Sequence, residues 1–166
     1  MIERDSDVRV GLMLLAAHEA RLVEWQPRAT QELRRIDLTD VAGDERELRG
    51  PSAAHPRGAP AAAAGFHSGQ QRDLHEQRLE KHRVAMIVLF AATVGSDAAR
   101  QGWPLVLVLG DPRLAHPAAR EIRRHGVAVE ESPRILGWLT PAELADAVAD
   151  DVEHALERLR VGVRSG

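Results

Sequence analysis

The residue types that could do chemistry gather in one short segment, residues 65–72, which reads Gly-Phe-His-Ser-Gly-Gln-Gln-Arg. Gly69 lacks a Cβ, so its main chain can approach a bound substrate more closely than other residues allow. Gln70 and Gln71 follow it, and an amide side chain beside such a contact can position a water molecule. The segment is therefore the part of the chain in which we expect any chemistry to lie.

A long helix is expected to carry this segment. Ser68 can cap the helix, and no helix-breaking residue follows Gln70 before Gly95. The first half of this span is polar, whereas residues 84–94 are apolar, so only the second half can pack against a core. The first half should project into solvent, and it carries a cluster of basic residues: Arg72, Arg78, Lys81, His82 and Arg83.

Three short apolar segments precede the site and predict strands. They span residues 8–15, 20–25 and 33–38, and their short connections are those of an antiparallel meander. Between them and the helix, glycines and prolines interrupt an Ala-rich stretch. We expect a flexible loop at about residues 39–67, which is either a functional loop or a disordered insertion.

Strands and helices alternate after the long helix. Residues 103–109 predict a buried strand with a helix behind it, and residues 127–129 and 135–139 are short extended candidates. A capping box at Thr140 begins a last helix that runs to about Leu159. This order predicts an α/β protein with an RNase H-like mixed sheet, in which a three-stranded antiparallel meander is followed by a long helix and then β-α-β-α.

Length and composition limit the class of protein. The chain has 166 residues, which suits a single domain over residues 1–166. It has no cysteine, and we expect a cytoplasmic protein without disulfides or Cys-ligated zinc. A formal net charge of −3 gives no overall basic field for DNA, and the apolar runs are too short to cross a bilayer. We therefore expect neither DNA nor a membrane as a partner.

Two other groups of residues suggest different chemistry. His75 and His82 share a helix face but lie seven residues apart, about two turns, which is too far for one metal ion to bridge easily. Asp111 follows a strand, where a nuclease would need several carboxylates, but the first strand offers none at its centre. We expect Asp111 to cap the next helix, and we expect no metal or other cofactor.

The position of residues 65–72, between an Ala-rich loop and a long polar helix, resembles the middle domain of archaeal and eukaryotic class 1 peptide chain release factors. In that domain a Gly-Gly-Gln tripeptide lies at the tip before a long basic helix. Residues 78–83, Arg-Leu-Glu-Lys-His-Arg, look similar to part of that helix. The likeness covers nearly the whole chain and extends to bacterial relatives in the Pelota-like superfamily. Ser68 departs from the pattern, because it stands where the first glycine would be.

The resemblance implies a ribosome-associated domain that promotes hydrolysis of the peptidyl-tRNA ester. Gly69 and Gln70 would be catalytic, with the glutamine backbone amide stabilising the developing oxyanion. Gln71 is the alternative to Gln70, since it improves the register with the family helix. Ribosomal RNA and tRNA would be the partners, with a translational GTPase as a further one. The implied RNA-binding residues are His67, Ser68, Arg72, Arg78, Lys81, His82 and Arg83.

The alternative is a non-hydrolytic factor that occupies the ribosomal A site, in hibernation or in rescue. Ser68 in place of glycine favours this alternative, because the loss of one glycine narrows the conformations open to the tip. Peptide release that depends on Gln70 would instead favour hydrolysis.

Overall fold

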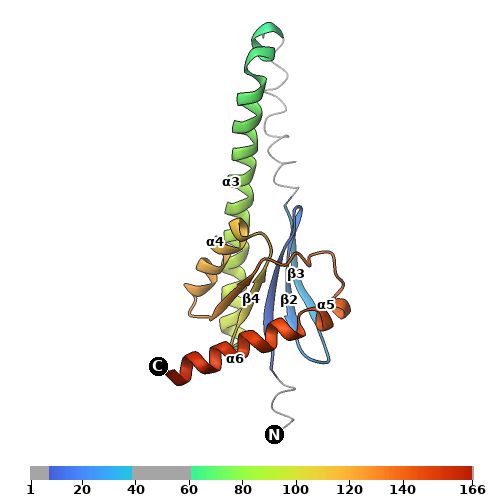
Figure 1. Ribbon diagram of the computed structural model, residues 1–166, viewed down its shortest axis with the longest axis vertical. Helices are drawn as coiled ribbons and strands as arrows, with labels where there is room; N and C mark the ends of the chain where they lie inside the picture. Colours follow the sequence, from blue (N-terminus) through green and yellow to red (C-terminus); the bar gives the residue numbers. More distant parts are fainter. Residues whose placement is uncertain (1–7, 39–60, 166) are drawn as a thin grey trace.

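The computed structural model describes the backbone of residues 8–38 and 61–165, and the side chains of residues 8–38 and 73–162. The elements follow the predicted order (Figure 1): β1 (Val10–Leu15), β2 (Glu19–Trp25), β3 (Gln31–Asp37), α3 (Ala61–Gln101), β4 (Val106–Leu109), α4 (Pro112–Arg123), β5 (Val129–Ser132), α5 (Pro141–Ala147) and α6 (Ala149–Ser165).

The five strands form one mixed sheet in the order β3-β2-β1-β4-β5. β1 and β2 pair antiparallel, as do β2 and β3, whereas β4 runs parallel to β1 and β5 runs parallel to β4. Each parallel pair needs a crossover, and α3 and α4 supply the helices for it. The predicted mixed α/β, RNase H-like fold is confirmed.

Helices cover both faces of the sheet, with α3 and α4 on one face and α5 and α6 on the other (Figure 1). Because side chains alternate along a strand, β1 sends Met13 and Leu15 to the α3 side and Leu12 and Leu14 to the α6 side. All four are buried, so β1 lies at the centre of a helix–sheet–helix sandwich.

The long helix α3 exceeds its predicted bounds at both ends. It begins at Ala61, so residues 61–67 are helical and the expectation of a loop there is wrong; residues 39–60 lie outside the described part of the chain. Alanine has the highest helix propensity, and four consecutive alanines offset the cost of Gly65. Gly95 does not end the helix either. A Cβ there would lie 2.6 Å from the Cδ2 atom of His125, so this glycine allows a close approach beside α4.

Two expectations for the C-terminal part also need correction. Residues 135–139 form no strand but a turn, in which the N–H of Leu139 donates to the carbonyl of Leu136 at 3.1 Å. The last helix is divided at Val148 into α5 and α6. Leu144, Val148, Val152 and Ala155 form one fully buried face, and the predicted capping box at Thr140 is present.

Among the described side chains of α3, those that pack on the sheet lie in its second half. Ile87, Ala91 and Val94 are fully buried on the α3 face. Further along the helix, the buried carboxylate of Asp97 accepts a hydrogen bond from Nε of Arg34 on β3 at 2.6 Å and also pairs with Arg100. Apolar packing and one ion-pair cluster therefore hold α3 in place.

The ion pair predicts how stability changes with pH. Burial tends to raise the pKa of Asp97, but Arg34 and Arg100 outweigh burial and lower that pKa. A carboxyl group with a lowered folded pKa stabilises the fold above its unfolded pKa of about 3.9, and this contribution is lost as the pH falls through the folded pKa. We expect Asp97→Asn to cost about 1–3 kcal/mol at neutral pH and to remove this part of the acid sensitivity.

Urea unfolding from neutral to acid pH measures both effects, with Asp146→Asn, an exposed carboxylate of α5, as the control. An Asp97→Asn variant as stable as the wild type at neutral pH would show that the pair does not hold α3.

Candidate functional site

The first half of α3 extends beyond the sheet (Figure 1). Toward its N-terminus the last buried side chain is Ile87, and residues 73–78 are exposed. Glu80 pairs with Arg113 at the start of α4, at 3.5 Å between Oε1 and Nη1. Residues 61–78 rise roughly 27 Å beyond that contact, at about 1.5 Å per residue.

The structure places Gly69, Gln70 and Gln71 inside this extension, in the third turn of α3. His67, Ser68 and Arg72 belong to the same helical stretch, so Ser68 does not cap a helix that starts after it. In an α-helix each N–H donates to the carbonyl four residues earlier. The backbone amide of Gln70 is therefore engaged within the helix, and it becomes available to an oxyanion only where this turn unwinds.

Most charges on the described part of the extension are segregated by helix face. The exception is Arg83, which is half-buried and lies seven residues after Glu76, on the same face as Glu76. Helical spacing puts Arg78, Lys81 and His82 on one face, at positions i, i+3 and i+4, and all three are exposed. The acidic residues Asp73, Glu76 and Glu80, at i, i+3 and i+7, lie on the opposite face. Glu80 is the residue that contacts α4, so the acidic face turns toward α4 and the basic face turns away.

The extension leaves the fold from the edge at which the parallel strands end. The connection from α3 to β4 is short, so β4 returns toward the end from which α3 came. The Arg113–Glu80 contact agrees with this placement, because Arg113 follows the carboxyl end of β4. The carboxyl ends of β1, β4 and β5 lie together, since these strands are parallel. We call this the carboxyl edge.

Asp111 at the carboxyl edge has a structural role. Its Oδ1 accepts from the backbone N–H of Arg113 at 3.0 Å and caps α4, as predicted. A hydrogen bond from the Arg113 side chain lowers the pKa of Asp111. Among the residues whose side chains are described, no group of three or more His, Asp or Glu could hold a metal ion. Nor does any described helix meet the length and hydrophobicity needed to span a membrane.

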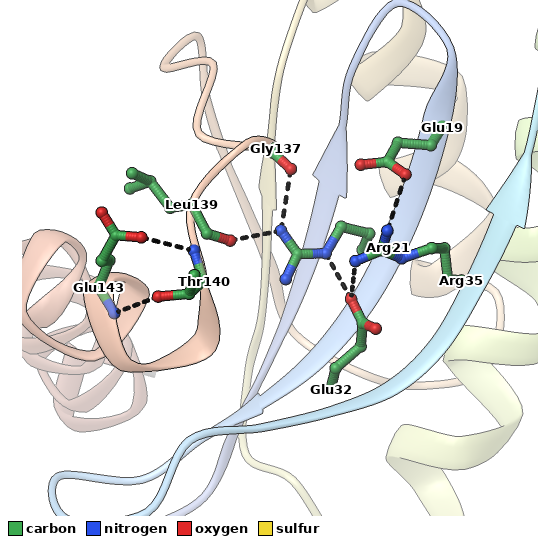
Figure 2. A network of polar contacts seen from close by, with 8 residues as sticks. All are labelled: Glu19, Arg21, Glu32, Arg35, Gly137, Leu139, Thr140 and Glu143. Atoms are coloured by element: carbon green, nitrogen blue, oxygen red, sulfur yellow. Dashed lines mark hydrogen bonds and ion pairs between the residues drawn. The ribbon is translucent and has the colours of Figure 1, made fainter.

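A buried arginine also lies near the carboxyl edge, and its role was not predicted from the sequence. Arg21 on β2 is 2% exposed, and its Nη1 donates to the carbonyls of Gly137 and Leu139, at 2.9 and 2.7 Å (Figure 2). Its Nε donates to Oε1 of Glu32 on β3 at 2.5 Å. Burial tends to raise the pKa of Glu32, but Arg21 and Arg35 outweigh that effect and lower it. The sequence signal was a charged residue in phase with the apolar residues Val23 and Trp25 of the same strand.

Comparisons with known proteins add little to these observations. No protein-family model and no curated protein matches the sequence. Among solved structures, the chain is similar to a Ppx/GppA phosphatase of Aquifex aeolicus, with a TM-score of 0.36 and 12% sequence identity. That match covers 76% of this chain and 36% of the phosphatase chain. A likeness this remote carries no conclusion about function.

The helical state of Gly69 makes a prediction of its own. A glycine in a helix interior costs about 0.5–1 kcal/mol relative to alanine. We therefore expect Gly69→Ala to stabilise the first turns of α3 and to slow amide hydrogen exchange across residues 61–72 a few-fold. Gly162→Ala is the matched control, because Gly162 lies in α6 with open space around it. Unchanged or faster exchange in the Gly69→Ala protein would show that Gly69 lies in a loop.

Proposed function

We propose that this chain is a ribosome-associated, release-factor-like domain. In this proposal the first half of α3 enters the RNA-lined peptidyl transferase centre, where Gly69 and Gln70 promote attack of water on the peptidyl-tRNA ester. The observation that carries it is a 41-residue helix whose second half packs on the sheet while its first half, with the Gly-Gln pair, extends beyond the fold.

The dimensions and composition of the extension suit a narrow RNA cavity. Residues 61–65 are four alanines and a glycine, which add little width to the helix backbone. Its reach of roughly 27 Å would leave the sheet outside the cavity. The basic face of Arg78, Lys81 and His82 lies between tip and sheet, where it can contact RNA phosphates.

Hydrolysis requires a change in the third turn of α3. Gly65 and Gly69 weaken the helix around that turn, so contact with the tRNA terminus can unwind it at a cost of a few kcal/mol. The freed amide of Gln70 would then donate to the ester oxyanion while its side chain holds the water. Gln71 is the alternative residue for this role.

A second candidate function is occupancy of the A site without hydrolysis. The specific observation in its favour is that Gly69 and Gln70 are helical, which leaves the Gln70 amide engaged. Ser68 in place of the first glycine points the same way. Both candidates need the same ribosomal position and differ only in whether the turn unwinds.

Peptide release separates the two candidates. We expect the wild-type chain to release peptide from ribosomes loaded with peptidyl-tRNA. We expect Gln70→Ala to lower the rate at least about tenfold without weakening binding, because the substitution removes the side chain that holds the water and leaves the backbone amide in place. Gln77→Ala, an exposed glutamine on the same helix, should leave release unchanged. Wild-type binding with release no faster than in buffer would leave occupancy as the better account, and failure to co-sediment with ribosomes would exclude both.

The basic face predicts salt-dependent binding. Arg78→Glu combined with Lys81→Glu should weaken co-sedimentation with ribosomes, because two phosphate contacts and their released counterions are lost. The slope of log K against log salt should fall in magnitude by about 1–2. Glu76→Gln, on the acidic face, should not weaken binding. Equal binding by the double variant and the wild type would contradict a phosphate contact at this face.

A further inference from the structure

One of the three tryptophans differs from the other two. Trp25 and Trp103 are each 5% exposed, and their indole N–H groups donate to the carbonyl of Ala145 and to the carboxylate of Glu24. Trp138 is 71% exposed. Aromatic residues make up only 3% of the chain, so a large indole at the surface is an unusual feature of this protein.

The turn that carries Trp138 is held rigidly. The guanidinium of Arg21 donates hydrogen bonds to the carbonyls of Gly137 and Leu139, the residues immediately before and after Trp138 (Figure 2). Leu136 is buried in the core, and a Cβ on Gly137 would lie 2.8 Å from the Cβ of Ala16. The backbone on both sides of the indole is therefore fixed before any ligand arrives, which reduces the entropy lost on binding.

This turn lies on the side of the fold from which α3 extends. It follows β5, whose carboxyl end belongs to the carboxyl edge. A surface that receives the first half of α3 therefore also faces the turn. Under the proposed function that surface is RNA.

We propose that Trp138 is a stacking platform for an unpaired nucleobase of the RNA that α3 enters, an inference that rests on the proposed function. Every base has a π face, and stacking on an aromatic side chain needs no particular sequence. A protein partner fits less well. Ile135 is the other large exposed hydrophobic residue described on this turn, so the turn lacks the cluster of apolar side chains that forms the core of a protein interface.

Tryptophan fluorescence tests this inference in the absence of ribosomes. We expect a single-stranded oligoadenylate to quench the emission of the full chain, and expect no quenching in Trp138→Ala, whose remaining tryptophans are buried. In co-sedimentation with ribosomes, Trp138→Ala should weaken binding about tenfold, equivalent to about 1.4 kcal/mol. Trp138→Phe should recover most of it, whereas Ile135→Ala, which removes a neighbouring apolar side chain without a π face, should not differ from the wild type.

The other outcomes overturn either the inference or the proposed function. Trp138→Ala binding ribosomes like the wild type, or no quenching by oligoadenylate, would exclude a stacking role. Weaker ribosome binding by Trp138→Ala, without quenching by oligoadenylate, would indicate that Trp138 contacts a ribosomal protein instead of a base. Quenching by oligoadenylate in a chain that does not bind ribosomes would retain the stacking site and reject the proposed function, so the two failures are distinguishable.

Discussion

The contact between the second half of α3 and the sheet determines where everything else in the molecule can act. Three fully buried side chains, Ile87, Ala91 and Val94, and the Asp97–Arg34 ion pair join the helix to the sheet. Each large apolar side chain so buried contributes about 1.5–3 kcal/mol. Because a helix is stiff over this length, the packed half also sets the direction of the first half, and no packing on the sheet is needed to position residues 61–72.

Two features at the carboxyl edge differ in how firmly their backbone is held. The first half of α3 can be stabilised or unwound by changes at Gly65 and Gly69, since glycine weakens a helix and the described side chains of residues 73–78 are exposed. The turn that carries Trp138 is fixed by a buried arginine that spans two backbone carbonyls. In our proposal the rigid turn would hold the domain against RNA, while the extension would reach the reacting bond and change conformation there.

Sequence reasoning succeeded where local signals and packing agree. The apolar run of residues 10–15 and the caps at Asp111 and Thr140 are local patterns, and the structure contains each of them. Prediction from the sequence failed where a distant residue determines the local backbone structure. Residues 135–139 are apolar enough for a strand, but Arg21, more than 100 positions away, holds their backbone carbonyls in a turn.

The start of α3 differs from the prediction for another reason: four consecutive alanines precede Gly65 and Ser68, and their helix propensity extends the helix through both residues. The candidate catalytic residues were identified by type and resemblance, but not their helical state, since helix and loop differ there by only a few kcal/mol. The proposed function depends on this small free-energy difference, because the Gln70 amide is free in the loop and hydrogen-bonded in the helix.

Cryo-electron microscopy of the full chain bound to ribosomes with peptidyl-tRNA in the P site tests the central claim most directly. The account predicts α3 inside the peptidyl transferase centre, with Gly69 and Gln70 beside the terminal ester of the tRNA and the sheet outside the cavity. Density for the domain at any other ribosomal position, or with the first half of α3 pointing away from the tRNA terminus, would contradict it.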